Sequence, residues 1–239
     1  MLTVGVLGGM GPAATIDFMA KVLAAGQGAR EQDQVRLIVD SNPGVLDRNA
    51  ALRGAGASPG PELAAMARGL EGAGADFLVM ACNTAHAWQD SIEAAISIPF
   101  VSIVDETLDW LASHHPAARR IGLLAADGCL EAGVYQGPMS ARGLEPIVAS
   151  PPDQALFMDA LYRVKAGDLS AGTKAIMLHV AAALVGQGAE VLIAACTEVP
   201  LLVGPKDVTA PLVDATEVLA LRTVAYANGA PITRQAPRR

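Results

Sequence analysis

The sequence predicts an α/β protein of two similar domains, each a parallel β-sheet flanked by helices, related by a pseudo-twofold axis with the functional site between them. Two observations lead to this prediction. Apolar, strand-like runs alternate with helical patterns along the chain. In addition, three segments repeat: VGVLGG (4–9) as IGLLAA (121–126), the run ending in Ala-Cys at Cys82 as that ending at Cys196, and SIVDET (102–107) as PLVDAT (211–216). This long period indicates two half-chains rather than a solenoid of shorter units.

Composition and charge narrow the class of protein. Of the 239 residues 52% are hydrophobic and 17% charged, which is typical of a compact folded protein and not of a disordered one. The net charge is −7, and no basic run is longer than a pair, as at Arg119-Arg120 and at the terminal Arg238-Arg239. These values argue against nucleic acid or an anionic membrane as a partner. With no leader-like pattern and no long apolar stretch, a cytoplasmic protein that acts on a small solute is expected.

In the first half, strands are expected at continuous apolar runs and helices where apolar residues recur at helical spacing. The expected strands are 2–8, 35–41, 76–82 and 99–105, and the expected helices are about 15–25, 62–72 and 85–96. A glycine loop precedes the first helix, with Pro12 where the first helical turn begins. The loop after the second strand, which contains Asp47 and Arg48, is long enough to be functional.

The second half repeats the alternation. Its expected strands are 120–126 and 190–195, and its expected helices are 106–114, 131–142, 153–165, 170–186 and 215–228. Because PLVDAT corresponds to SIVDET, the last helix is expected to return to the first domain. The predicted domains are therefore 1–105 plus 215–239 and 106–214. Residues 231–239 lack apolar periodicity and are expected to be a frayed tail.

The two repeated cysteines predict the chemistry. In parallel sheets ligands bind beyond the carboxyl ends of the strands. The side chains at or just after such ends are Met10, Asp40, Cys82, Asp105, Asp127, Cys196 and Asp214. Two facing sheets would set Cys82 and Cys196 on opposite walls of a cleft. Such a pair suits inversion at a carbon, because one thiolate can remove a proton from one face while the other thiol donates from the opposite face.

The surroundings of the cysteines suggest how they could be activated. Each precedes an expected helix start, where free backbone N–H groups can lower a thiol pKa and can also hold a carboxylate. The spacing of Cys82, Cys129 and Cys196 does not predict a metal site, and free thiols are expected. Cys129 is interpreted as a structural residue or a neighbour of the site. His86 could pair with Cys82, but a hydrogen-bonded residue of the first helical turn is the favoured interpretation.

Several motifs resemble those of the aspartate/glutamate racemase family, and are most similar to its aspartate racemases. They are GGMGP (8–12), DR (47–48), ACNTAH around Cys82, VKAG (164–167) and ACTEVP around Cys196. The resemblance implies a cofactor-independent racemase that deprotonates and reprotonates an acidic amino acid at Cα, without pyridoxal phosphate. It also implies a homodimer. Where relatives tend to show a threonine in the second domain, this chain has Cys129 after Gly128.

The resemblance also implies roles for individual residues. Cys82 and Cys196 would be the acid/base pair. The substrate-binding residues would be Met10, Arg48, Asn83, Thr84, Lys165, Thr197 and Glu198. Arg48 and Lys165 would face the substrate side chain, which fits an acidic substrate because a desolvated carboxylate must be paired. For Glu198, capping of the following helix is an open alternative.

Three other functions stay open. Residues 9–14 fit the dinucleotide pattern G-x-G-x-x-A, and Asp40 ends the second strand, as in NAD-linked oxidoreductases. Against this reading, Pro12 lacks the N–H that would face a pyrophosphate. A dicarboxylate cis/trans isomerase or decarboxylase of the same superfamily is the second alternative, although the decarboxylase type resembles a protein with one catalytic cysteine. A non-catalytic binding domain is the third.

Overall fold

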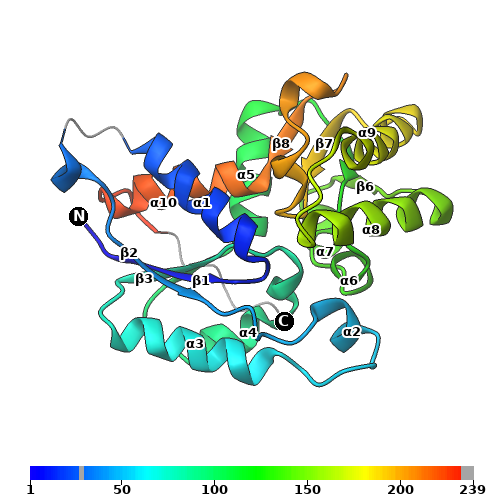
Figure 1. Cartoon of the computed structure of the whole chain (residues 1–239). Coiled ribbons are helices and arrows are strands. Elements are labelled where there is room, and N and C mark those ends of the chain that lie inside the picture. Colours follow the sequence, from blue (N-terminus) through cyan, green and yellow to red (C-terminus); the bar gives the residue numbers. More distant parts are fainter. Residues whose placement is uncertain (27–29, 233–239) are drawn as a thin grey trace.

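The computed structural model describes residues 1–26 and 30–232. They form two four-stranded parallel sheets with the same strand order, β2-β1-β3-β4 and β6-β5-β7-β8 (Figure 1). The two sheets, each flanked by helices, confirm the predicted fold class. From residue 233 onward, the expected frayed tail lies outside the described residues.

The elements of the first sheet and its helices come first in the chain. In order they are β1 (Val4–Gly8), α1 (Pro12–Ala25), the 3₁₀-helix η1 (Glu31–Asp33), β2 (Leu37–Ser41), α2 (Arg48–Leu52), α3 (Gly60–Gly72), β3 (Phe77–Met80), the 3₁₀-helix η2 (Thr84–Trp88), α4 (Gln89–Glu93) and β4 (Phe100–Val101). As expected, Pro12 occupies the first turn of α1.

The second sheet and its helices follow. In order they are α5 (Ile103–His114), β5 (Arg120–Leu123), α6 (Asp127–Glu131), α7 (Gln136–Ala141), β6 (Glu145–Ile147), α8 (Pro151–Lys165), α9 (Ala171–Gly186), β7 (Val191–Ala194), the 3₁₀-helices η3 (Val199–Leu201) and η4 (Pro205–Asp207), β8 (Leu212–Asp214) and α10 (Ala215–Ala227).

The structure corrects the prediction of a strand at 99–105. That strand covers Phe100–Val101 alone, because the Ser102 side chain caps α5 by accepting a hydrogen bond from the backbone N–H of Asp105. The helix therefore begins at Ile103, and Asp105 lies in its first turn instead of at a strand end.

Three other expectations were wrong in detail. In place of the helix expected at 131–142, α6 begins earlier and ends at Glu131, just before Gly133 with its positive φ of 64°, and α7 covers only Gln136–Ala141. The helix expected at 85–96 is the 3₁₀-helix η2 followed by the short helix α4. Both α2 and β6 lie in segments expected to be loops.

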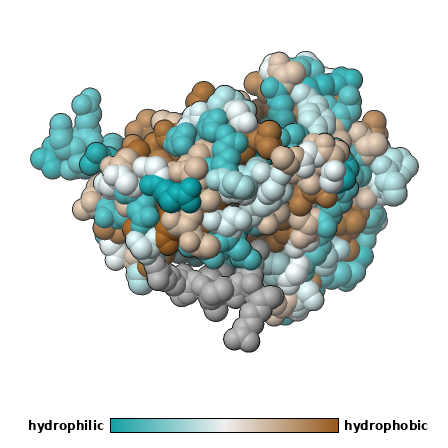
Figure 2. Space-filling view, turned by 90° about the horizontal axis from the view of Figure 1, so that it is seen from below, coloured by the Kyte–Doolittle hydropathy of each residue, from teal (hydrophilic) through white to brown (hydrophobic). Residues whose placement is uncertain are grey.

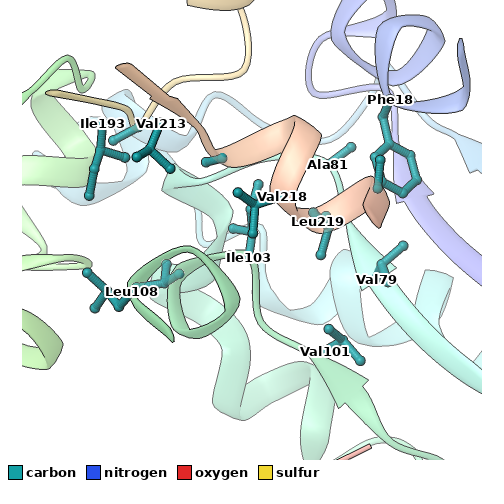
Figure 3. Packing of buried hydrophobic residues seen from close by; sticks show 14 of the residues in the cluster. Phe18, Val79, Ala81, Val101, Ile103, Leu108, Ile193, Val213, Val218 and Leu219 are labelled. Carbon is teal, nitrogen blue, oxygen red and sulfur yellow. The ribbon is translucent and has the colours of Figure 1, made fainter. Parts of the chain in front are cut away.

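One hydrophobic core extends across both sheets. It contains Val4 of β1 and Ile121 of β5, together with buried side chains of α5 and α10. Figure 3 shows Val218 and Leu219 of α10 close to Ile103 of α5, between side chains of the two sheets. Helix α10 also packs against α1. Because one core joins the two halves, the division into 1–105 plus 215–239 and 106–214 stays a prediction.

The internal repeat extends to the packing of two glycines. A Cβ at Gly5 of β1 would overlap with the side chain of Leu78, and a Cβ at Gly122 of β5 would overlap with that of Leu192. The same three residue types surround each glycine: Leu78, Ala75 and Leu70 at Gly5, and Leu192, Ala189 and Leu184 at Gly122. In each sheet, a helix (α3 or α9) thus packs close to the strand that is second in the sheet order (β1 or β5), at a glycine of that strand.

Replacing either Gly5 or Gly122 by alanine should therefore destabilise the protein by about 1–3 kcal/mol, because an added methyl overpacks a dense core. Urea unfolding would measure this effect. Gly69 of α3 is the matched control: it is exposed, and nothing lies within 4 Å of a Cβ built there. Alanine at Gly69 should leave stability unchanged or raise it slightly. Equal stability of all three variants would contradict the packing argument.

The surface is mixed in character. Over the described residues of the face in Figure 2, hydrophilic and hydrophobic side chains are interspersed. None of the helices in the described ranges combines the length and the apolar character needed to cross a bilayer.

Candidate active site

A pocket lies where the carboxyl ends of strands from both sheets meet. Met10 follows β1, Cys82 follows β3, Ala126 follows β5 and Cys196 follows β7. The complete lining is Met10, Arg48, Asn49, Cys82, Asn83, Thr84, Ala126, Lys165, Cys196, Thr197 and Glu198. The structure therefore brings all nine sequence-predicted site residues together around one pocket, and adds Asn49 and Ala126.

The two cysteines occupy matching positions in the two sheets. Each follows the third strand in its sheet order, β3 for Cys82 and β7 for Cys196. Each is 6% exposed and lines the pocket. Neither is part of a disulfide. This arrangement offers two sulfur atoms on the walls of one enclosed space.

Glu198 is hydrogen-bonded to Cys196. The Cys196 thiol donates to Glu198 Oε2 at 3.1 Å, and the Thr197 hydroxyl donates to the same oxygen at 3.3 Å. Glu198 is 4% exposed, and its other oxygen, Oε1, accepts no hydrogen bond from the described residues. The carboxylate therefore sits where it can receive the proton of Cys196 and still has an oxygen for a ligand. Its side chain makes no capping hydrogen bond to the 3₁₀-helix η3 that follows.

The environment of Cys196 differs from the expectation that a helix start lowers the pKa of its thiol. Burial, and then the negative charge of Glu198, raise the pKa of Cys196 well above its ordinary value, although Lys165 opposes the shift. The elements that follow the two cysteines are the short 3₁₀-helices η2 and η3. Neither is an α-helix whose dipole would stabilise a thiolate at its N-terminus. Cys196 is therefore a protonated thiol in the free protein.

Lys165 keeps its positive charge in this pocket. Its burial favours the neutral amine, but the negative charge of Glu198 opposes that effect, and the pKa of Lys165 is raised. The ammonium lies 3.8 Å from Glu198 Oε1, an ion pair too long for a hydrogen bond. Its N–H groups therefore remain able to donate to an anionic ligand.

Arg48 holds the loop that contains Met10. Its guanidinium donates to the carbonyl oxygens of Val45 and Leu46 at 2.9 and 3.0 Å, and to that of Met10 at 3.3 Å. A guanidinium has five N–H donors, so these three bonds leave further donors for a ligand. The expected role of Arg48 toward a substrate side chain stays a prediction.

Two asparagines join the halves at the pocket. Asn83 accepts a hydrogen bond from the Tyr135 hydroxyl at 2.7 Å. Asn49 accepts one from the backbone N–H of Gly128 at 2.9 Å and donates to the Tyr162 hydroxyl at 3.4 Å. The sequence analysis did not find Asn49, although it directly follows Arg48 in a segment singled out as functional.

His86 and Cys129 lie outside the pocket lining. The His86 ring lies between backbone groups, with Nδ1 2.8 Å from the carbonyl oxygen of Cys82 and Nε2 accepting from the N–H of Ile103 at 3.2 Å. This confirms the interpretation of His86 as a hydrogen-bonded structural residue. Cys129 is 1% exposed, and burial raises its pKa far above the ordinary value, which disfavours its thiolate.

A second, more open hollow adjoins the pocket. The two share Arg48, Lys165 and Glu198, and the hollow continues past the N-terminus of α1. Among the described residues, no group of three or more His, Cys, Asp or Glu side chains is arranged to hold a metal ion.

The known proteins that this chain resembles in sequence and structure include racemases. A sequence model of the family described as Asp/Glu/Hydantoin racemase matches residues 7–223. The broad specificity amino-acid racemase RacX of Bacillus subtilis (strain 168) is 27% identical over 235 residues, covering 92% of this chain and 96% of that protein.

Solved structures agree in fold. The aspartate racemase of Picrophilus torridus superposes with a TM-score of 0.83 at 27% identity, over 95% of each chain. An aspartate racemase homologue from Pyrococcus horikoshii superposes with a TM-score of 0.76 at 24% identity, over 95% of this chain and 100% of that one. At that lower identity the likeness concerns the fold alone.

Proposed function

Because the chain belongs to the Asp/Glu/hydantoin racemase family, we propose that it interconverts L- and D-aspartate, with glutamate as the second candidate substrate, by proton transfer at Cα between Cys82 and Cys196. Membership of the family makes the protein an isomerase of the amino-acid racemase class. The observation that carries the two-base mechanism is that both thiols line one pocket, each from its own sheet. Neither pyridoxal phosphate nor a metal enters the proposed reaction.

The reaction needs one thiolate and one thiol. The thiolate sulfur takes the proton from Cα of the bound amino acid, and the bonding electrons stay on the substrate as a carbanion. The opposite thiol then gives its proton to the other face of Cα, which inverts the centre. After one turnover the protonation states of Cys82 and Cys196 are exchanged, so the same pair serves the reverse direction.

Glu198 supplies the proton acceptor that Cys196 requires. Because Cys196 is protonated in the free protein, it can act as a base only after it loses a proton. Glu198 Oε2 is 3.1 Å from its sulfur and can take that proton. The ammonium of Lys165 favours the thiolate that remains, since its charge opposes the rise in the pKa of Cys196. No such acceptor is assigned to Cys82.

The charges of the pocket support an acidic substrate. The pocket lining contains two basic side chains, Lys165 and Arg48, and one acidic side chain, Glu198. Together these three side chains have a formal charge of one positive unit. A dicarboxylic amino acid has one negative charge at neutral pH and would balance it. The relatives named as aspartate racemases favour the same substrate class, whereas the broad specificity of RacX allows a wider range.

Proton exchange at Cα tests the proposal directly. The protein would be incubated with L-aspartate, and separately with L-glutamate, in deuterated water without added cofactor. Proton NMR would follow the loss of the Cα signal, and chiral chromatography would follow the D enantiomer. Deuterium incorporation with formation of the D enantiomer is expected. No exchange with either amino acid would contradict the proposal and favour the dicarboxylate isomerase or the NAD-linked alternative.

Lys165→Met should reduce the preference for acidic substrates. The substitution removes the cation and keeps much of the side-chain volume, so the ratio of kcat/KM for aspartate to that for asparagine should fall at least about tenfold. Steady-state racemisation of both amino acids measures the ratio. Lys174→Met is the matched control, because Lys174 pairs with Asp207 at 2.8 Å and is not part of the pocket lining. Equal losses for both substrates would remove the proposed role of Lys165.

A further inference from the structure

A hydrogen bond connects a core side chain of the second half to the pocket wall of the first. Tyr135 directly precedes α7 and is completely buried, with 0% of its side chain exposed. Its hydroxyl donates to Asn83 Oδ1 at 2.7 Å. Asn83 immediately follows Cys82 and lines the pocket. Tyr135 itself does not line the pocket, so it can affect a ligand only through another residue.

This bond fixes which end of the Asn83 carboxamide faces the pocket. A carboxamide has an accepting oxygen at one end and a donating NH₂ group at the other. Tyr135 occupies the oxygen, which leaves Nδ2. That nitrogen is buried and has no hydrogen-bond partner among the described residues. A buried donor without a partner is rare and unfavourable, so this one indicates a ligand that accepts a hydrogen bond there.

Burial keeps the Tyr135 hydroxyl a donor. It raises the pKa of Tyr135 well above the ordinary value, so the phenol is protonated throughout the physiological range. If the carboxamide were turned around, its oxygen would face the incoming ligand and would repel an anion. The hydrogen bond from the Tyr135 hydroxyl to Oδ1 therefore holds the orientation that presents an N–H to an anionic ligand.

We propose that Tyr135 is a positioning residue, whose hydroxyl orients Asn83 so that Nδ2 donates to the α-carboxylate of the bound amino acid. This inference rests on the proposed racemase function. It assigns a role to a residue that the sequence motifs did not indicate. It also makes the contact between the two halves a determinant of substrate affinity.

The test is Tyr135→Phe, which removes the hydroxyl and keeps the ring that fills the core. We expect KM for the amino-acid substrate to rise about tenfold, which is the loss of one hydrogen bond to a charged group. We expect kcat to fall less, because the cysteines and Glu198 are unchanged. Circular dichroism and the urea midpoint would establish that the variant is folded.

Tyr226→Phe is the matched control. The Tyr226 hydroxyl is also in the core and donates to Glu106 Oε1 at 2.6 Å, away from the pocket. Its loss should lower the urea midpoint and leave KM unchanged. A double-mutant cycle with Asn83→Ala completes the design, since Tyr135→Phe should have no further effect on KM once the carboxamide is absent.

The outcomes separate this inference from the proposed function. An active wild-type protein whose Tyr135→Phe variant has an unchanged KM would overturn the inference alone. A rise in KM that persists undiminished in the Asn83→Ala background would also overturn it, because Tyr135 would then act by another route. A wild-type protein that racemises neither amino acid would overturn the proposed function, and the role of Tyr135 with it.

Discussion

Cys82→Ser and Cys196→Ser should each lower kcat/KM for racemisation by about two to four orders of magnitude, the range associated with loss of a general acid or base. A serine hydroxyl has nearly the size of the thiol but is a far weaker acid, so it cannot form the anion that takes the Cα proton. Racemisation followed by polarimetry measures the loss. Cys129→Ser is the control: its thiol is buried outside the pocket, and the rate should stay near that of the wild type.

The two serine variants should also differ from each other in a way that a purely structural role would not produce. Each retains one thiol, so each should still exchange the Cα proton of one enantiomer with deuterated solvent without inverting it. The two variants should exchange opposite enantiomers, because the proposed mechanism assigns each thiol to one face of Cα, and the two thiols follow strands of different sheets. Near-normal racemisation by either variant, or exchange of the same enantiomer by both, would eliminate the two-base mechanism.

Glu198→Gln should lower kcat by about two orders of magnitude or more, because Cys196 loses the carboxylate that accepts its proton. The glutamine has almost the same shape, so the change is mainly one of charge. The negative charge of Glu198 helps to raise the pKa of Cys196. Its removal should therefore lower that pKa, and any part of the profile of kcat/KM against pH that reflects Cys196 deprotonation should move to lower pH.

A matched control for this substitution is Glu106→Gln. Glu106 is a partly buried carboxylate that pairs with Arg222 and accepts a hydrogen bond from Tyr226, outside the pocket. It should leave both the rate and the pH profile unchanged. If Glu198→Gln retained the wild-type rate, or if the limb of the profile moved to higher pH, Glu198 would not be the proton acceptor of Cys196.

The internal repeat explains why so much of the pocket could be predicted. Each parallel sheet gathers the residues that follow its strands at its carboxyl-end edge, and Cys82 and Cys196 follow matching strands of the two sheets. Asn49 and Tyr135 could not be found in this way, because neither follows a strand. Tyr135 reaches Asn83 across 52 residues of sequence. The packing of α6 against α2 and η2 of the first half brings this part of the second half close to Asn83.

The wrong end of the strand expected at 99–105 could have been recognised from the sequence. Ser102 followed by Asp105 fits the polar spacing at a helix N-terminus, and it outweighed the apolar run that suggested a longer strand. The expectation of a thiolate at a helix N-terminus failed for another reason. Burial and a neighbouring carboxylate depend on the tertiary structure, and their effect on Cys196 has the opposite sign to that of a helix dipole.

Substitutions in the hydrophobic core between the sheets would affect the catalytic rate of this enzyme as well as its stability. Because α5 and α10 lie within one core that reaches both sheets, their packing helps to fix how the two sheets, and therefore the cysteines that follow β3 and β7, are placed relative to each other. Transfer of a proton from either face of one carbon depends steeply on that relative placement. Exchanges of large for small residues such as Val218, far from any bound amino acid, would then change turnover as well as stability. Selection for catalytic activity would therefore limit which residues this core can accept, although none of its residues need contact the substrate.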